Sequence, residues 1–362
     1  MLGGVALLNG SSETDGVLLP PASPPDAADD SRFNALTELP VETAKFAEEK
    51  DVVHVAIVKT TGREDGIARA VALLGEMDFS GKDVYLKGSY NSPDPFPATT
   101  HPDSLGAMVR MLRNKGVGSV TLVERSGMGR TREVMEKLHV LTSLEKLDIS
   151  LIPLDELPYG AWRHLKLSGS LWTKGIDFPD FLTRNKCVVQ LCNLKTHRFG
   201  GEFSASLKNT IGLIAKYAAA ESDSTGTEND DKTSKRRWNY MMELHSSPHQ
   251  GQMIAEANQA YVPELVVMDA VEVFVSGGPE RGITSATEII AASCDRVALD
   301  AVGFAILQFA GARISVSVHG FDQEQIKHAA KLNLGINSPQ KIRIVSDDNT
   351  GRLLASRLEG LL

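Results

Sequence analysis

The sequence predicts an α/β fold with a mostly parallel, doubly wound sheet and helices on both of its faces. Apolar, strand-like runs at 51–59, 83–87 and 119–124 alternate with helical patterns at 66–77 and 105–116. Such alternation is typical of parallel strands joined by crossover helices. With 42% hydrophobic and 23% charged residues over 362 positions, the chain has the composition of a globular protein with a substantial core.

The later part of the chain continues this alternation. Residues 147–154, 164–172 and 186–194 are expected to be strands, and a helix is expected from about 203 to 218. The remaining expected elements are a helical region near 250–260, strands at 264–275 and 287–293, a helix at 296–310, and a closing helix and strand at 323–335 and 341–345.

Composition also suggests how the chain is divided. Residues 1–50 are rich in Pro, Asp and Ser and are expected to form an extended or disordered arm. The α/β domain then covers 51–362, with a division into subdomains 51–150 and 151–362 left open. The polar segment 221–237 is expected to be a mobile loop.

Charge and composition exclude some classes of partner and leave others open. A net charge of -8 without a basic stripe argues against nucleic acid, and no apolar run is long enough to span a membrane. The short apolar start at 1–10 is either a loose N-terminus or the remnant of an export signal that lacks its basic region. A cytoplasmic location is expected by default, and export if that remnant is genuine.

The three cysteines, Cys187, Cys192 and Cys294, show neither a disulfide framework nor zinc or iron–sulfur ligand spacing. No intrinsic iron–sulfur cluster is therefore expected, and the sequence names no cofactor. His245 and His249 are weak metal candidates, because Pro248 between them disfavours one continuous helix.

The strongest candidate site is LCNLKTHRFGGEFSASLKNTIG, residues 191–212, where an apolar strand ends in a cationic turn. Lys195, His197 and Lys208 are the candidate catalytic residues, since they could converge on a carboxylate or phosphate. The alternative is that these are unrelated charges on a solvated turn. The same stretch offers the candidate ligand-binding residues Arg198, Gly200, Gly201, Ser204 and Asn209, with Ser204 and Lys208 expected on one helical face.

Two more loops leave strand ends, where open α/β sheets bind their ligands. The loop 87–102 and the glycine turn 275–282 supply the candidate ligand-binding residues Lys87, Asn91, Thr99, Thr100, Gly277, Gly278 and Pro279. Asp269 is a further candidate because it lies on an apolar face of its strand and must have a partner there. It either pairs with a site lysine or caps a loop.

Several ordered motifs resemble the widespread bacterial and archaeal family called domain of unknown function 362. They are LKTH at 194–197 with LKNTIG at 207–212, the segment 98–124 that begins ATTHP, and SCDRVALDA at 293–301. The resemblance spans roughly 52–346. It implies an α/β fold and no general activity. Many relatives carry a ferredoxin-like module or a twin-arginine export signal. This sequence lacks the cysteines of such a module, and its apolar first residues would suit the tail of such a signal, although the arginines are absent.

The chain departs from the family pattern at three places. Lys87-Gly88-Ser89 stands where Lys-Pro-Asn is usual, Val275 where a glutamate is usual, and Arg296 where a proline is usual. We therefore identify the chain as a divergent member of this family.

The leading hypothesis is an enzyme of unassigned class whose cationic cleft binds a small anion and supports proton transfer or isomerisation. The first alternative is an oxidoreductase or electron-transfer partner that works with a separate iron–sulfur protein. The second is a non-catalytic anion-binding protein. Substrate, reaction class and oligomeric state stay open at this level.

Overall fold

The structure is a computed structural model that describes residues 52–183, 186–200, 202–219, 226–229, 237–314 and 319–362. The arm expected at 1–50 and most of the loop expected at 221–237 lie outside these residues.

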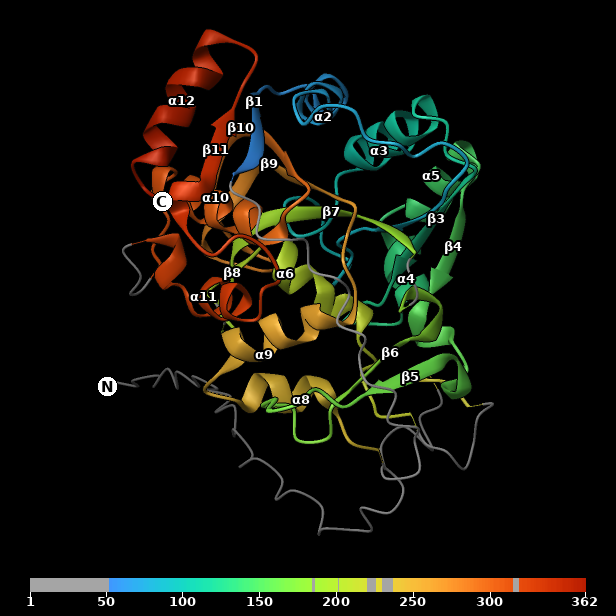
Figure 1. The fold of residues 1–362 in the computed structure, drawn as a ribbon. Coiled ribbons are helices and arrows are strands. Elements are labelled where there is room, and N and C mark those ends of the chain that lie inside the picture. The colour runs from blue at the N-terminus through green and yellow to red at the C-terminus, as the bar shows by residue number, and fades with distance from the viewer. Residues whose placement is uncertain (1–51, 184–185, 201, 220–225, 230–236, 315–318) are drawn as a thin grey trace, which may run out of the picture. The chain divides into compact units, whose positions relative to one another are not determined.

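A nine-stranded sheet forms the centre of the described chain (Figure 1). Its order is β11-β1-β10-β9-β7-β2-β3-β4, with β8 paired to β7 off this path, and β5 and β6 form a separate two-stranded sheet. The strands are β1 Val53–Lys59, β2 Asp83–Lys87, β3 Ser119–Glu124, β4 Ser150–Pro153, β5 Trp162–Leu165, β6 Ile176–Pro179, β7 Cys187–Thr196, β8 Phe203–Ser204, β9 Leu265–Gly277, β10 Gly282–Ser293 and β11 Ile342–Val345.

The sheet is mostly parallel, as the alternating pattern predicted. The pairs β3/β4, β2/β3, β2/β7, β7/β9 and β1/β11 are parallel. The antiparallel pairs β9/β10, β1/β10 and β7/β8 make it a mixed sheet. The carboxyl ends of β2, β3, β7 and β9 consequently lie at one edge of the sheet.

Helices cover both faces of this sheet (Figure 1). On one face, Leu191 and Val267 belong to the core that packs under α2 and α3. Leu194 and Met268 have the opposite strand parity and meet Gly303 of α10 on the other face. The helices are α2 Arg63–Ala72, α3 Pro102–Asn114, α4 Thr131–Lys137, α5 Val140–Leu147, α6 Ser206–Asn209, α8 Tyr240–Ser246, α9 Gln250–Ala257, α10 Arg296–Phe309, α11 Glu324–Lys331 and α12 Asn349–Glu359.

Strands from both sides of the expected subdomain division share this sheet. β2 and β3 precede residue 150, whereas β7 and β9 follow it, and β2 pairs directly with β7. A division into subdomains stays a prediction.

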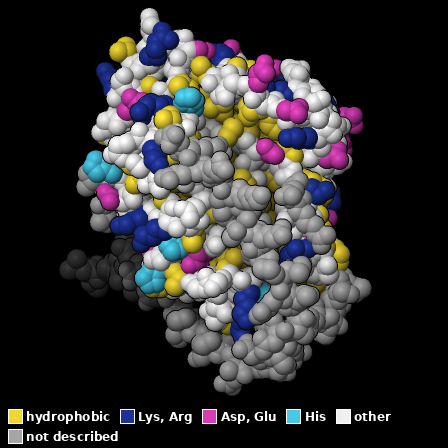
Figure 2. All heavy atoms as spheres, in the orientation of Figure 1, with side chains coloured by type: hydrophobic (Ala, Val, Ile, Leu, Met, Phe, Trp, Pro, Cys, Tyr) yellow, Lys and Arg dark blue, Asp and Glu magenta, His cyan; other side chains and the backbone are white. Residues whose placement is uncertain are grey.

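Within the described ranges, no helix has the length and apolar character required to cross a bilayer. On the face seen in Figure 2, acidic and basic side chains are interspersed over the residues that the structure describes. A patch of a single sign of charge does not dominate the described part of that face. This mixed surface fits the modest net charge of -8.

The long helix expected from about 203 to 218 is wrong. Residues Phe203–Ser204 form strand β8, α6 makes a single turn over Ser206–Asn209, and a short 3-10 turn covers Thr210–Leu213. The guanidinium of Arg125 donates to the carbonyl of Ile211 at 3.0 Å and to that of Ile214 at 2.5 Å. Ile214 has extended backbone angles (φ -85°, ψ 143°), so the chain leaves the helical path there, and the Arg125 guanidinium holds this exit in place.

The strand expected at 164–172 is also wrong over most of its length. β5 spans Trp162–Leu165 and pairs with β6, after which the chain turns. The apolar residues Leu167 and Trp172 suggested a longer strand. Both are buried, but they lie in the loop that follows β5. The helices α4, α5, α8 and α12 were not anticipated from the sequence pattern.

Candidate functional site

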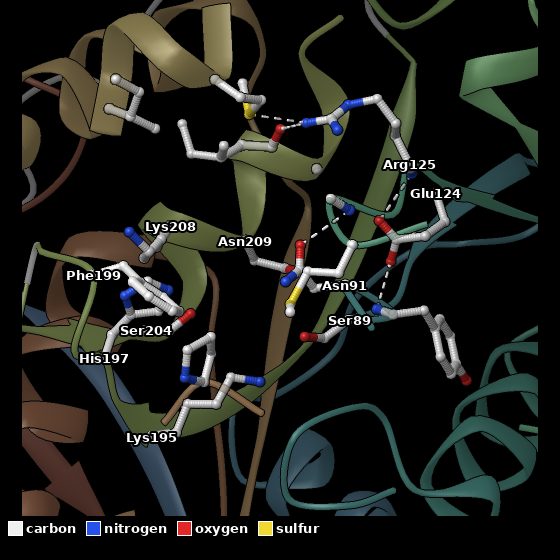
Figure 3. A pocket seen from close by; sticks show the side chains of 18 of the residues that line it. Ser89, Asn91, Glu124, Arg125, Lys195, His197, Phe199, Ser204, Lys208 and Asn209 are labelled. Atoms are coloured by element: carbon white, nitrogen blue, oxygen red, sulfur yellow. Dashed lines mark hydrogen bonds between the residues drawn. The ribbon is translucent and has the colours of Figure 1, made fainter. Parts of the chain in front are cut away.

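A cavity of about 560 Å³ opens where the carboxyl ends of β2, β3 and β7 meet the turn after β9 (Figure 3). It contains side chains from all three loops that the sequence analysis selected. The predicted site residues that line it are Lys87, Asn91, Lys195, His197, Ser204, Lys208, Asn209 and Pro279, together with the metal candidate His245.

The β7–β8 hairpin and the single turn of α6 hold the cationic side of this cavity. Lys195 on β7 lies directly across from Ser204 on β8, and α6 then presents Lys208 and Asn209. Ser204 is therefore on a strand, so the expected shared helical face with Lys208 is wrong, although both residues line the cavity. Figure 3 shows Lys195, His197, Ser204 and Lys208 gathered on one side, with Glu124 and Arg125 on the other.

Asp300 of α10 fixes the start of α6. Its carboxylate accepts hydrogen bonds from the backbone amides of Ser206 at 2.7 Å and Leu207 at 3.0 Å. These two amides would otherwise have no helical acceptor, so Asp300 serves as a remote N-terminal cap. Burial raises the pKa of Asp300 to about 7, while the two amide bonds act in the opposite direction.

Lys195 and Lys208 are buried cations without a carboxylate partner in the described part of the chain. Lys195 is 3% exposed and donates to the carbonyl of Ala98 at 2.5 Å, and Lys208 is 9% exposed and lies 3.5 Å from the carbonyl of Gly200. Burial lowers the pKa of each lysine to about 8. A buried charge with only neutral partners is unfavourable, so an anion in the cavity would stabilise both.

His197 is close enough to both lysines for their charges to affect its pKa. Burial lowers its pKa well below the usual value, and the charges of Lys208 and Lys195 lower it further, so the ring is neutral at pH 7. Its Nδ1 is buried without a hydrogen-bond partner among the described residues. Burial followed by the charge of Lys208 also lowers the pKa of His245. The cavity therefore holds two lysines beside two neutral imidazoles.

Lys87 differs from the other two lysines because it forms a buried ion pair. Its Nζ lies 2.7 Å from Oε1 of Glu124 and donates to the carbonyl of Gly88 at 2.7 Å and to Oδ1 of Asn209 at 3.2 Å. Burial lowers the pKa of Lys87 and raises that of Glu124, and each partner's charge opposes the effect of burial on the other. The charge of Lys87 is thus already balanced within the protein.

Gly212 fits directly against this ion pair. A Cβ atom at position 212 would lie 2.8 Å from Oε1 of Glu124 and 2.9 Å from Nζ of Lys87. We expect Gly212→Ala to lower the free energy of unfolding by about 1–3 kcal/mol, because the extra methyl group overpacks a buried site. Denaturant titration measures this change. Gly360→Ala is the control, since a Cβ there would meet its nearest atom at 3.5 Å, and an equal loss in both variants would contradict the prediction.

Glu124 and Arg125 are the chief functional residues that sequence reasoning missed. Both line the cavity, and Glu124 ends β3 next to the end of β2. A signal was available, because a charged pair that ends an apolar strand is the same feature that identified Lys87. The other lining residues not anticipated are Ser89, Tyr90, Gly127, Met128, Phe199, Ile211, Gly212, Met241 and Leu244.

Some predicted residues support the cavity without lining it. The hydroxyl of Thr100 accepts a bond from the Ser89 amide at 2.8 Å, and that of Thr99 donates to the Asp94 carbonyl at 2.8 Å. These threonines stabilise the loop that follows Lys87. Gly200 offers its carbonyl to Lys208, and Gly201 lies outside the described residues.

The glycine turn after β9 is held by Arg198. Its guanidinium donates to the carbonyl of Gly278 at 2.9 Å and forms an ion pair with Glu280. Gly278 has φ +66°, and a Cβ there would overlap the carbonyl of Thr196. Arg198, Gly277 and Gly278 therefore shape the cavity wall from outside, whereas Pro279 reaches the lining.

Asp269 pairs with neither site lysine. Its Oδ2 accepts from Nε of Arg63 at 2.8 Å and from the hydroxyl of Ser104, and its Oδ1 accepts from the Val271 amide at 3.1 Å. Asp269 is not among the lining residues, so the structure separates it from the candidate ligand site and gives it a local structural role.

His245 and His249 lie on different elements. His245 belongs to α8 and lines the cavity, whereas His249 precedes α9 and lies 3.7 Å from Oε1 of Glu324. Among the residues that the structure describes, no group of three or more His, Cys, Asp or Glu side chains has the arrangement of a metal site.

The fold and the site together define a class: an α/β protein with a buried cationic cavity at the carboxyl ends of parallel strands. A family model described as "Domain of unknown function (DUF362)" matches residues 84–305, and the chain belongs to this family. The match includes Lys87, Lys195 and Lys208. A thylakoid-associated protein of Synechocystis sp. is 24% identical over 250 residues, which cover 67% of this chain and 68% of that protein.

Two solved structures resemble the chain at low sequence identity. The lactate racemase apoprotein from Thermoanaerobacterium thermosaccharolyticum gives a TM-score of 0.40 at 14% identity, covering 74% of this chain and 59% of that one. A Thermotoga maritima protein gives 0.39 at 15% identity, covering 68% and 57%. Each match spans less than two thirds of the solved chain.

Proposed function

We propose that this cavity is the active site of an enzyme that binds a small anionic molecule, a carboxylate or a phosphate, and moves a proton on it. In this proposal Lys195 and Lys208 hold the negative charge, and His197 transfers the proton. Lys87 has a different role from the one first expected. Because its charge is balanced by Glu124, it orients Asn209 instead of binding the anion itself.

The observation that supports this proposal is the pair of buried lysines, Lys195 and Lys208, for which the described residues supply no counter-ion. Two neighbouring polar atoms, Nδ1 of His197 and Nδ2 of Asn209, are also buried without a partner among the described residues. Buried polar groups are nearly always hydrogen-bonded, so each exception needs an explanation. A bound anion with hydrogen-bonding oxygens would satisfy the lysines and both of these atoms together.

His197 would gain basicity when the anion binds. Its pKa is held down by burial and by the charges of Lys208 and Lys195, and an anion between those lysines would offset their charges. A pKa closer to neutral is the condition under which an imidazole transfers protons well at pH 7. Anion binding would therefore prepare the residue that acts on the bound molecule.

Anion affinity is expected to fall steeply as the pH rises from 7 to 9. Both lysines have a pKa of about 8 in the free protein, so they are mostly charged at pH 7 and mostly neutral at pH 9. If both must be charged in the complex, the dissociation constant rises by on the order of 10-fold to 100-fold over this interval. Calorimetric titration with 3-phenylpropanoate and phenyl phosphate measures the change. A constant affinity across this range would exclude these lysines from anion binding.

Proton transfer is tested separately from binding. In D₂O, the hydrogens next to the carboxylate of 3-phenylpropanoate or lactate are expected to exchange for deuterium in the presence of the protein, which proton NMR detects. His197→Gln should abolish exchange while a ligand still binds. Tight binding with no exchange or other turnover in any ligand would favour the non-catalytic anion-binding alternative.

A further inference from the structure

We infer that the ligand of this cavity is a monocarboxylate with an uncharged, apolar body, and that phosphates and amino acids are excluded. The inference rests on the proposed function and specifies its substrate class. Three features of the cavity carry it: the apolar side chains of the lining, the shortage of available carboxylates among the described lining residues, and the occupied backbone amides at the start of α6 and in the glycine turn.

The lining is apolar away from the cationic side. Met128, Phe199, Ile211, Met241, Leu244 and Pro279 come from five separate segments and meet around one space. Two of them are partly open to solvent, Met128 at 49% and Phe199 at 46%. In Figure 3 the ring of Phe199 lies beside Lys208 and His197. If a carboxylate ligand is bound beside the lysines, its apolar group would cover Met128 and Phe199. The ligand would bind more tightly because this apolar surface is removed from water.

The described lining offers no available carboxylate for a cationic group on the ligand. Among the described lining residues, Glu124 is the sole carboxylate. It already receives Nζ of Lys87 at 2.7 Å, the Tyr90 amide at 2.9 Å and the Arg125 amide at 3.0 Å. An amino acid would place its ammonium group next to Lys195 and Lys208 without a free carboxylate among the described lining residues. Such a like-charge contact selects strongly against a zwitterion.

Backbone amides at the start of α6 and in the glycine turn are already bonded, which disfavours a phosphate at these two places. Proteins commonly bind phosphate with several free amides at a helix N-terminus or in a glycine turn. Here the first amides of α6, from Ser206 and Leu207, are occupied by Asp300, and the Gly278 amide donates to the Arg281 carbonyl at 2.8 Å. The two ammonium groups match the charge of a dianion, but a phosphate has three oxygens and would not find the free amides of these segments, whereas a carboxylate needs fewer donors.

Calorimetric titration of the full chain at pH 7 with four matched probes tests this inference. Against acetate, 3-phenylpropanoate is expected to bind at least about 30-fold more tightly, since each buried methylene is worth roughly a fourfold gain. Phenylalanine, which differs from 3-phenylpropanoate by its ammonium group, is expected to bind at least about tenfold more weakly than it. Phenyl phosphate is expected to bind more weakly than 3-phenylpropanoate as well.

Two half-exposed residues provide variants that should leave the fold intact. Met128→Gln and Phe199→Gln are each expected to weaken 3-phenylpropanoate binding by about fivefold while acetate binding stays the same. Met242→Gln is the matched control, because Met242 is 56% exposed on the same helix as Met241 but lies outside the lining. This control should bind every probe as the unmodified chain does.

The outcomes separate the inference from the proposed function. Equal affinity for acetate and 3-phenylpropanoate would overturn the apolar body and leave anion binding in place. Tighter binding of phenyl phosphate or of phenylalanine would overturn the choice of head group. Failure of all four probes to bind would overturn the proposed function itself. The expected ranking, with loss only in the Met128 and Phe199 variants, would support both.

Discussion

Lys87→Met is expected to lower the free energy of unfolding by about 3–5 kcal/mol, because it leaves the carboxylate of Glu124 buried without its counter-ion. The side chains of Lys87 and Glu124 are 2% and 1% exposed, and their charged atoms lie 2.7 Å apart. With domain stabilities of about 5–15 kcal/mol, a loss of this size removes a large part of the total. Denaturant titration followed by circular dichroism measures it.

A double variant distinguishes the ion pair from simple packing at position 87. Lys87→Met combined with Glu124→Gln removes both charges, so most of the lost stability is expected to return. If the single variant is as stable as the unmodified chain, Glu124 is already neutral in the folded protein. If the double variant is as unstable as the single one, the loss reflects packing instead of charge.

Lys195→Met and Lys208→Met are expected to act in the opposite direction on stability and to abolish anion binding. The pKa of each lysine is about 8 in the folded protein and about 10.4 in an unfolded chain, so each protonated lysine destabilises the fold at pH 7 by about 2–3 kcal/mol. Replacing it with an apolar side chain of similar length removes this penalty. We expect the free energy of unfolding of each variant to be about 1–3 kcal/mol higher than that of the unmodified chain. We also expect neither variant to be stabilised by a ligand.

The direction of the pH effect follows from the lowered pKa values. Between pH 8 and pH 10 the unfolded chain binds more protons than the folded chain at these two positions, so their effect on stability becomes less unfavourable as the pH rises. The advantage of the Met variants should therefore be largest below pH 8 and shrink above it. Denaturation midpoints at pH 7 and pH 9.5, compared with the unmodified chain, measure this trend.

The same Lys→Met substitution at three lysines of one cavity is thus expected to change the free energy of unfolding in two opposite directions. Lys87→Met should destabilise, whereas Lys195→Met and Lys208→Met should stabilise while ligand binding is lost. Loss of stability at all three positions would show that Lys195 and Lys208 also have a counter-ion in the free protein. Retained binding in both the Lys195 and the Lys208 variants would place the anion elsewhere.

Much of the site was predictable because parallel strands bring their carboxyl ends to one edge of the sheet. Lys87 and Lys195 each stand at the end of an apolar strand, and that position alone assigned them to a common edge. The carboxylate of Asp269 shows the limit of this reasoning. Its burial was expected, but its partner Arg63 is 206 residues away, and only the packed structure brings the two together.

The error at 203–218 had a related cause. Leu207, Ile211 and Ile214 have helical spacing, and all three are buried, so the apolar pattern was a sound guide to burial. It was a poor guide to backbone conformation, because Ile214 is extended and the distant Arg125 binds the carbonyls of Ile211 and Ile214 at this exit from the turn. A hydrogen bond between residues 86 or more positions apart leaves no trace in local periodicity.

By itself the sequence determined the fold class and the strand ends that meet at one edge, and it proposed the turn 191–212 as the candidate site, since periodicity and strand ends are local properties of the chain. Only the tertiary structure decided which lysines carry an unbalanced charge. The carboxylate of Glu124 neutralises Lys87, whereas within the described ranges Lys195 and Lys208 donate only to carbonyl oxygens. Electrostatic energy depends on distances and burial, and these are fixed when distant segments pack together.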